Sequence, residues 1–189
     1  AAERGLMPKP RFIINTTLAC DANLLTFRRL ADFFRVPQYV IDVPYEPDEA
    51  AVAYVAEQLR GMQAFLEEQT GRKIDQDALR EAVARSQRSM DNYDRYLSLR
   101  ADRLILGDSA GELFSAFALH TLLGTPETEA YTEQCLRLAE QAPPAAGVRL
   151  MWMHTNPFWA KPLRDLTDFR KQVQIVGCDM CYEGLIHAD

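Results

Sequence analysis

The feature that most constrains the fold is a strand–helix–strand pattern in residues 12–42. Residues 12–14 form a β-branched and aromatic run, Phe-Ile-Ile, that predicts a short strand. A polar loop follows, and then apolar residues recur at helical spacing: Leu24, Leu25, Phe27, Leu30, Ala31 and Phe34. Pro37 ends this helix, and residues 39–41 predict a second strand. Two strands joined by a helix indicate a parallel sheet with a right-handed crossover.

The next segment, residues 47–142, is predicted to be helical. Asp48 is a candidate cap for a first helix, which Thr70-Gly71 ends. We expect one face of this helix to be apolar, from Val52, Val55, Leu59, Met62 and Leu66. A second helix is expected after an Asp75 cap, with Ile74 and Leu79 as a hydrophobic staple. Its predicted apolar face comprises Leu79, Val83, Ser86, Met90, Tyr93 and Leu97.

Two further helices complete this segment. Ser109 and Glu112 fit a capping box for the third, in which we expect Phe114, Phe117 and Leu122 to be largely buried. Thr125-Pro126 predicts the start of the fourth, with proline at the first helical position. The apolar face of the fourth helix is expected to contain Tyr131, Cys135 and Leu138.

A second strand–helix–strand pattern closes the sequence. Residues 148–153 predict a buried strand, residues 162–172 a helix and residues 173–176 another strand. The predicted fold class is therefore α/β, with parallel-sheet units flanking a mostly helical middle. We expect residues 1–46 to be the C-terminal part of a first α/β domain, residues 47–142 the helical segment, and residues 143–189 the start of a second α/β domain. Units this small cannot bury a sheet alone, so we expect both ends to be cut from a longer chain.

Charge and hydropathy argue against two classes of partner. The net charge is −6, and no basic stripe is present, which argues against nucleic-acid binding. No apolar run, that at residues 150–153 included, approaches the length needed to cross a membrane, and the first residues lack the apolar core of a signal peptide. We therefore expect a cytoplasmic protein, in which the 4 cysteines are free, metal-binding or redox-active rather than paired in disulfides.

Cys20 is the most informative single position, because it lies between a predicted strand and a predicted helix. Ligands of open α/β sheets collect beyond the carboxyl ends of strands, and helix N-termini stabilise a thiolate or an anionic group. These arguments favour a functional cysteine. A small buried apolar residue is the alternative interpretation.

Other candidate residues follow the second unit's strands. Cys178 and Cys181 form a CxxC motif, which is compatible with a redox pair, half a zinc site, cluster ligands or two incidental thiols. His154 follows the strand at residues 148–153, where it could donate a proton to a substrate or act as a structural loop residue. Cys135 fits core packing best. The sequence has no GxGxxG, P-loop or HExxH motif, so dinucleotide binding and nucleotide hydrolysis have no direct support.

Several segments together resemble the 2-hydroxyacyl-CoA dehydratase D-component family, which includes the benzoyl-CoA reductase subunits. They are residues 8–17 (PKPRFIINTT), Cys20-Asp21, residues 41–45 (IDVPY), residues 54–59 and 65–74, and residues 149–154 with 157–159. The resemblance covers essentially the whole chain. It implies flavodoxin-like (Rossmann-like) α/β domains with inserted helices, and a [4Fe-4S] cluster bound by three cysteines.

The resemblance assigns one cluster ligand to Cys20 and implies further ligands outside this sequence. It gives no reason to expect ligands at Cys178 and Cys181, which stay candidates from their spacing alone. The implied activity is elimination of water from a 2-hydroxyacyl-CoA through a ketyl radical. An ATP-dependent activator supplies the electron, and a sister subunit completes a heterodimer. The alternatives are a benzoyl-CoA reductase-type subunit or a related low-potential reductase, a non-catalytic electron-relay subunit, and an α/β protein without metal.

Overall fold

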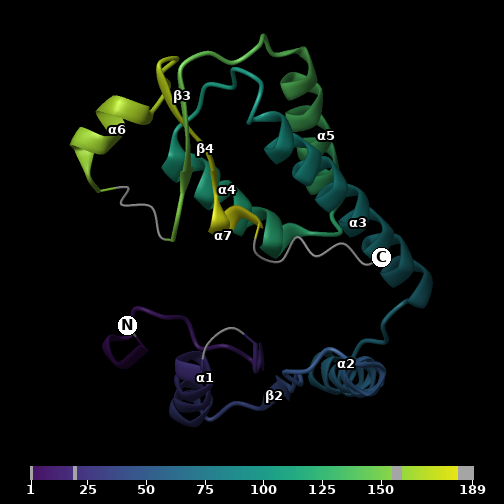
Figure 1. Cartoon of the computed structure of the whole chain (residues 1–189). Coiled ribbons are helices and arrows are strands. Elements are labelled where there is room, and N and C mark those ends of the chain that lie inside the picture. The colour runs from purple at the N-terminus through teal and green to yellow at the C-terminus, as the bar shows by residue number, and fades with distance from the viewer. Residues whose placement is uncertain (1, 19–20, 155–158, 183–189) are drawn as a thin grey trace. The chain divides into compact units, whose positions relative to one another are not determined.

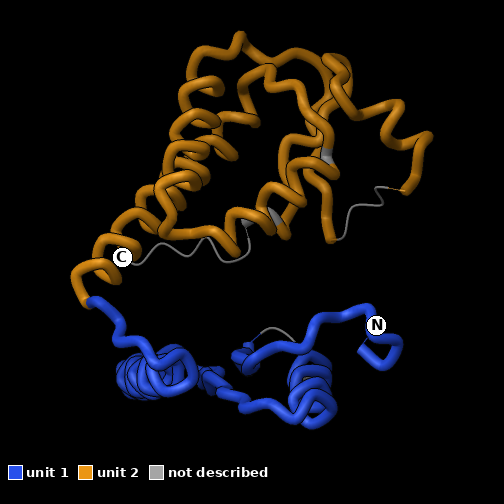
Figure 2. Tube along the Cα trace, turned by 180° about the vertical axis from the view of Figure 1, so that it is seen from behind, with its two compact units in different colours: residues 1–75 blue, residues 76–189 orange. Residues whose placement is uncertain are grey.

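The computed structural model describes residues 2–18, 21–154 and 159–182 and divides the chain into two compact units, Ala1–Asp75 and Gln76–Asp189 (Figure 2). Each unit contains one pair of parallel strands with helices, so the chain is a mixed α/β protein. The flavodoxin-like arrangement and the three-part domain division remain predictions.

The first unit has the expected strand–helix–strand order (Figure 1). A 3-10 turn, Ala2–Arg4, precedes β1 (Ile13–Thr16), α1 (Asp21–Phe34), β2 (Gln38–Ile41) and α2 (Glu49–Thr70). β1 and β2 are parallel and pair in register from Ile13 with Gln38 to Thr16 with Ile41. The predicted strand–helix–strand unit at residues 12–42 is therefore confirmed.

Local capping fixes both ends of α2. The Asp48 carboxylate accepts a hydrogen bond from the Ala51 amide at 2.7 Å, and Gly71 ends the helix in the left-handed conformation, with φ 70°. Both capping predictions are confirmed. The predicted apolar face is only partly covered, however, because Val52 is 69% and Leu59 46% exposed.

The α2 helix packs against β2 through a small aromatic cluster. The rings of Phe12 and Tyr39 each contact Phe65, with centroids 5.6 and 5.5 Å away. The Tyr39 hydroxyl donates to the Gln58 carbonyl at 2.8 Å and lies 2.2 Å from where a Cβ on Gly61 would be. Glycine at position 61 is what lets the tyrosine approach the helix backbone.

The second unit contains three long helices and the other strand pair (Figure 1). Its elements are α3 (Gln76–Leu99), α4 (Ser109–Leu122), α5 (Pro126–Gln141), β3 (Val148–Trp152), α6 (Lys161–Thr167), β4 (Val173–Cys178) and α7 (Asp179–Tyr182). The α3 and α5 helices pack along each other, and α7 packs against α4. The core cluster comprises Tyr93, Tyr96, Leu97, Leu113, Ala116, Leu119, Ala139 and Cys178.

The N-terminus of α4 differs from the predicted capping box. Asp108, rather than Ser109, caps the helix: its carboxylate accepts from the Gly111 amide at 2.7 Å. The Glu112 carboxylate pairs instead with Arg100, in the turn directly after α3. At α5 the prediction is confirmed, with Thr125 as cap and Pro126 at the start of the helix.

The buried face of α4 was predicted wrongly. Phe114, Phe117 and Leu122 are 56%, 43% and 52% exposed, and the core instead takes Leu113, Ala116 and Leu119. The α5 helix likewise buries Thr128, Thr132, Leu136 and Ala139, whereas Tyr131 and Leu138 of the predicted apolar face are exposed. In α3, Tyr93 and Leu97 are buried as predicted, but Leu79 and Val83 are exposed.

The strands β3 and β4 are parallel, with an irregularity in register. Leu150 pairs with Ile175, but Met151 pairs with Gly177, so Val176 is an extra residue on β4. Among the described residues β3 is not buried as predicted, since Val148, Leu150 and Met151 are all exposed. The predicted helix at residues 162–172 is shorter: α6 ends at Thr167, and Phe169 has a left-handed backbone, with φ 53°.

Candidate functional site

In the first unit, hydrogen bonds connect the chain segments at the carboxyl ends of β1 and β2. The Val43 amide donates to the Thr17 hydroxyl at 2.8 Å, and the Thr17 amide donates to the Ile41 carbonyl at 3.0 Å. The Tyr54 hydroxyl donates to the Asp42 carboxylate at 3.0 Å, which raises the pKa of that phenol. The Thr17 bonds join the segment after β1 to β2 and the segment after it, and the Tyr54 bond joins that second segment to α2.

Cys20 is the site residue predicted for the first unit. It lies in sequence between the end of β1 at Thr16 and the start of α1 at Asp21, as predicted, but residue 20 itself is outside the described residues. Its side-chain environment therefore remains a prediction.

In the second unit, His154 and the three consecutive residues 178–180 form a hydrogen-bonded group at the carboxyl ends of β3 and β4. The His154 amide donates to Asp179 Oδ1 at 2.8 Å. The Cys178 thiol donates to the His154 carbonyl and to Asp179 Oδ1, each at 3.4 Å. The Met180 amide also donates to Asp179 Oδ1, at 2.9 Å. The structure thus brings together two predicted site residues, His154 and Cys178, through a third residue, Asp179.

Asp179 is held as an ionised carboxylate. The hydrogen bond from the His154 amide contributes most to lowering the pKa of Asp179; partial burial opposes this, and the Cys178 thiol and the Met180 amide lower it further. Sequence reasoning missed this residue. An acidic residue directly after a strand and at the start of a helix was the available signal.

The environment of Cys178 suits a thiol better than a thiolate. The side chain is 5% exposed and belongs to the core cluster, and its thiol donates to two oxygens, the His154 carbonyl and Asp179 Oδ1. A nearby carboxylate disfavours a second negative charge, and iron ligation requires the thiolate. Within the described part of the chain, no group of three or more His, Cys, Asp or Glu side chains is arranged to hold a metal ion. The side chain of Cys181, in α7, lies outside the described side chains, so a ligand role for the CxxC pair remains a prediction.

Cys135 packs against the core as expected. It is half-buried beside the α3–α4–α5 cluster, and burial raises the pKa of its thiol. Of the aromatic residues after His154, Trp159 is 71% exposed, and Phe158 is outside the described residues.

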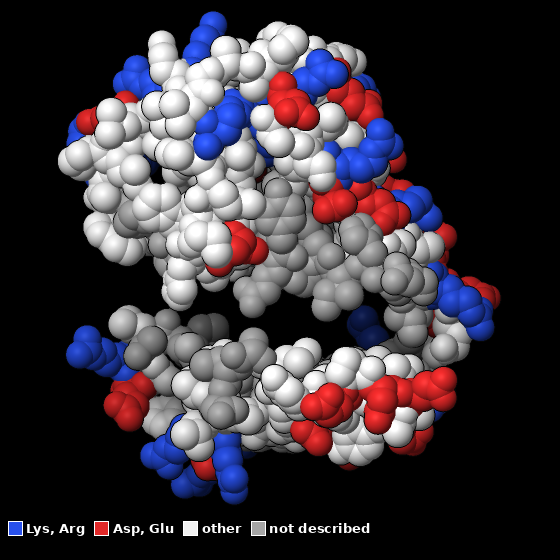
Figure 3. Space-filling model, viewed as in Figure 1, with Lys and Arg blue, Asp and Glu red and all other residues white. Residues whose placement is uncertain are grey.

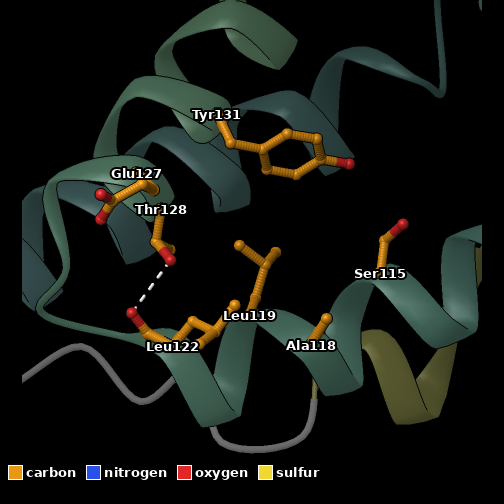
Figure 4. A pocket seen from close by; sticks show the side chains of 7 residues that line it. All are labelled: Ser115, Ala118, Leu119, Leu122, Glu127, Thr128 and Tyr131. Atoms are coloured by element: carbon orange, nitrogen blue, oxygen red, sulfur yellow. Dashed lines mark hydrogen bonds between the residues drawn. The ribbon is translucent and has the colours of Figure 1, made fainter.

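A cavity of about 280 Å³, which the sequence did not indicate, opens between α4 and α5 (Figure 4). The Tyr131 ring lies across it from Leu119 and Ala118, and the Thr128 hydroxyl is turned to the Leu122 carbonyl, to which it donates at 2.9 Å. The remaining lining residues are Ser115, Leu122 and Glu127. The walls are mainly apolar, so the cavity suits a hydrocarbon or aromatic group better than an ion.

Surface charge and helix composition give two further findings. On the face of the second unit shown in Figure 3, basic and acidic side chains are interspersed rather than gathered in a basic stripe. None of the described helices combines the length and apolar character that a bilayer crossing requires.

Comparisons with known proteins identify the family. A sequence model of the family described as 2-hydroxyglutaryl-CoA dehydratase, D-component, matches residues 1–188. Lactoyl-CoA dehydratase subunit alpha of Anaerotignum propionicum is 32% identical over 93 residues, which are 47% of this chain and 22% of that relative. The chain thus spans only about a fifth of the relative's length in this match. Because the family match extends over nearly the whole chain and confirms the resemblance seen in the sequence, this protein belongs to the 2-hydroxyglutaryl-CoA dehydratase D-component family.

Proposed function

We propose that this chain is part of a subunit of a cytoplasmic 2-hydroxyacyl-CoA dehydratase, which eliminates water from a 2-hydroxyacyl-CoA through a substrate radical. The observation that carries this proposal is the family match over residues 1–188. The name of the lactoyl-CoA dehydratase relative supports the same reaction on a short 2-hydroxyacyl group, and its designation as subunit alpha supports a sister subunit as partner.

The cofactor in this proposal is a [4Fe-4S] cluster with Cys20 as one ligand. When bound, such a cluster supplies single low-potential electrons, which an ATP-dependent activator would deliver. The support is positional, because residue 20 lies at a strand-to-helix junction where a helix N-terminus favours negative charge. The buried position of Cys178 in the core cluster does not favour cluster ligation, and the proposal gives that thiol no role in the reaction.

His154 is the proposed proton donor or acceptor for the substrate. It lies two residues after the end of β3, and it is exposed at the carboxyl end of a parallel strand pair, where ligands of α/β proteins bind.

The test uses the full-length protein with its sister subunit and activator, prepared without oxygen and supplied with ATP. Lactoyl-CoA, 2-hydroxyglutaryl-CoA and benzoyl-CoA are offered separately, and the CoA products are identified by mass spectrometry. We expect an enoyl-CoA from one of the hydroxyacyl substrates. Reduction of benzoyl-CoA without any dehydration would instead establish the reductase alternative.

Two cysteine variants test the cofactor in the same preparation. Cys20→Ala should lose both bound iron and turnover, whereas Cys135→Ala, in a half-buried core position, should keep both. Full iron content and turnover in Cys20→Ala would contradict the assignment. Iron analysis of Cys178→Ala and Cys181→Ala then decides whether the CxxC pair contributes ligands.

A further inference from the structure

His154 has a backbone conformation that residues with a side chain rarely adopt. Its φ angle is 68°, in the left-handed region. A histidine in this conformation persists only where surrounding contacts hold it. This backbone sets the direction of the Cα–Cβ bond, from which the imidazole extends.

The contacts that hold it come from the end of β4 and the start of α7. On one side, the His154 amide donates to Asp179 Oδ1 at 2.8 Å. On the other side, the His154 carbonyl accepts from the Cys178 thiol at 3.4 Å. The backbone amide and the backbone carbonyl of His154 are therefore bound by two adjacent residues, 25 and 24 positions further along the chain.

We propose that Asp179 is a positioning residue, whose Oδ1 holds the His154 backbone in its left-handed conformation and so directs the imidazole toward the substrate. This inference rests on the proposed function, in which His154 exchanges a proton with that substrate. The Met180 amide donates to the same oxygen and fixes Asp179 in turn, at 2.9 Å. The required feature is the acceptor oxygen, which asparagine also has and alanine lacks.

The first test measures hydrogen exchange at the His154 amide in the full-length complex, with mass-spectrometric fragmentation to single-residue detail. In Asp179→Ala this amide should exchange faster by on the order of tenfold. In Asp179→Asn it should exchange close to the wild-type rate. The Tyr96 amide in the core of α3 serves as the control and should not change. An unchanged rate at His154 in Asp179→Ala would overturn the proposal.

The second test separates positioning from a merely structural contribution. Asp179→Ala should lower kcat by about tenfold to about a hundredfold with little change in KM, because a displaced imidazole impairs the chemical step more than binding. Asp179→Asn should restore most of that loss. Faster exchange at His154 with an unchanged kcat in Asp179→Ala would overturn the positioning role.

His154→Gln distinguishes this inference from the proposed function on which it rests. Full turnover in His154→Gln would show that the imidazole has no part in the reaction and would remove the catalytic half of the argument. The hydrogen-exchange result would still report whether Asp179 holds the backbone.

Discussion

Arg100, in the turn directly after α3, and Glu112 of α4 form a largely buried ion pair, with 2.5 Å between Arg100 Nη1 and Glu112 Oε1. The Tyr96 hydroxyl donates to the same carboxylate oxygen at 2.9 Å, and Arg100 Nη2 donates to the Ile175 carbonyl of β4 at 3.2 Å. Burial alone would lower the pKa of Arg100, but the Glu112 charge and the Tyr96 oxygen outweigh it and raise that pKa. One guanidinium therefore joins two helices and a strand of the second unit.

Removing Glu112 should strongly destabilise the second unit. Glu112→Ala leaves the Arg100 charge, whose side chain is 6% exposed, without its carboxylate, and we expect a loss of about 3 kcal/mol in the free energy of unfolding. Urea unfolding followed by circular dichroism measures this loss. The control is Glu133→Ala, at an exposed position of α5, which should change stability by less than about 0.5 kcal/mol. Equal urea midpoints for the two variants would show that the ion pair contributes nothing.

Truncating the cap of α5 should cost less. The Thr125 hydroxyl accepts from the Thr128 amide at 3.2 Å, so Thr125→Ala should lower the free energy of unfolding by about 1 kcal/mol. Thr125→Ser keeps the hydroxyl oxygen and should restore most of the loss in the same urea experiment. If the serine variant is as unstable as the alanine variant, the methyl group rather than the cap accounts for the effect.

Gly61 and Tyr39 should show strong coupling in a double-mutant cycle. A Cβ at position 61 would lie 2.2 Å from the Tyr39 hydroxyl, so Gly61→Ala must displace that group and break its bond to Gln58. We expect a loss of about 1–3 kcal/mol in the wild-type background. Tyr39→Phe removes the clashing hydroxyl. In that background, Gly61→Ala should be less destabilising, because alanine has a better helix propensity than glycine by about 1 kcal/mol. Additive effects in thermal unfolding would contradict the close approach.

Glu67 should make the stability of the first unit depend on acid pH. A hydrogen bond from Lys73, followed by those from the Ile74 amide and Gln63, lowers the pKa of Glu67 from 4.5 to about 2. Because the folded pKa is below the unfolded one, the contribution is complete above about pH 4.5 and is lost as the pH falls toward 2.

The measurement is urea unfolding at a series of pH values from about 2 to about 6, which covers both the folded and the unfolded pKa of Glu67. Glu67→Gln should lose part of the decline in stability seen on acidification. Glu68→Gln, at the neighbouring exposed position, should keep the wild-type profile. Identical pH profiles for Glu67→Gln and the wild type would refute the assignment.

The sequence predicted best what neighbouring residues decide. Asp48, Gly71 and Thr125-Pro126 act within one helical turn, and each was predicted in its observed role. The rotation of α4 could not be predicted in this way. Apolar residues lie all round that helix, so periodicity alone does not choose between the face of Leu113 and Leu119 and the face of Phe114 and Phe117.

Two members of the candidate site were predictable, but Asp179 and the contacts that join the members were not. His154 and Cys178 follow from their places at strand ends. The role of Asp179 depends on its contact with His154, 25 positions earlier in the chain. That contact depends in turn on the pairing of β3 with β4. No local pattern encodes that contact.

The extra residue at Val176 has a practical consequence for reading related sequences. Since side chains alternate between the two faces of a strand, a relative with one residue fewer at this point would present the opposite side of its strand end. An ungapped comparison of the two chains would then match some other residue to Asp179 and miss the true counterpart. Alignments of this family should therefore be checked for an offset between positions 175 and 177 before any acidic residue is judged present or lost.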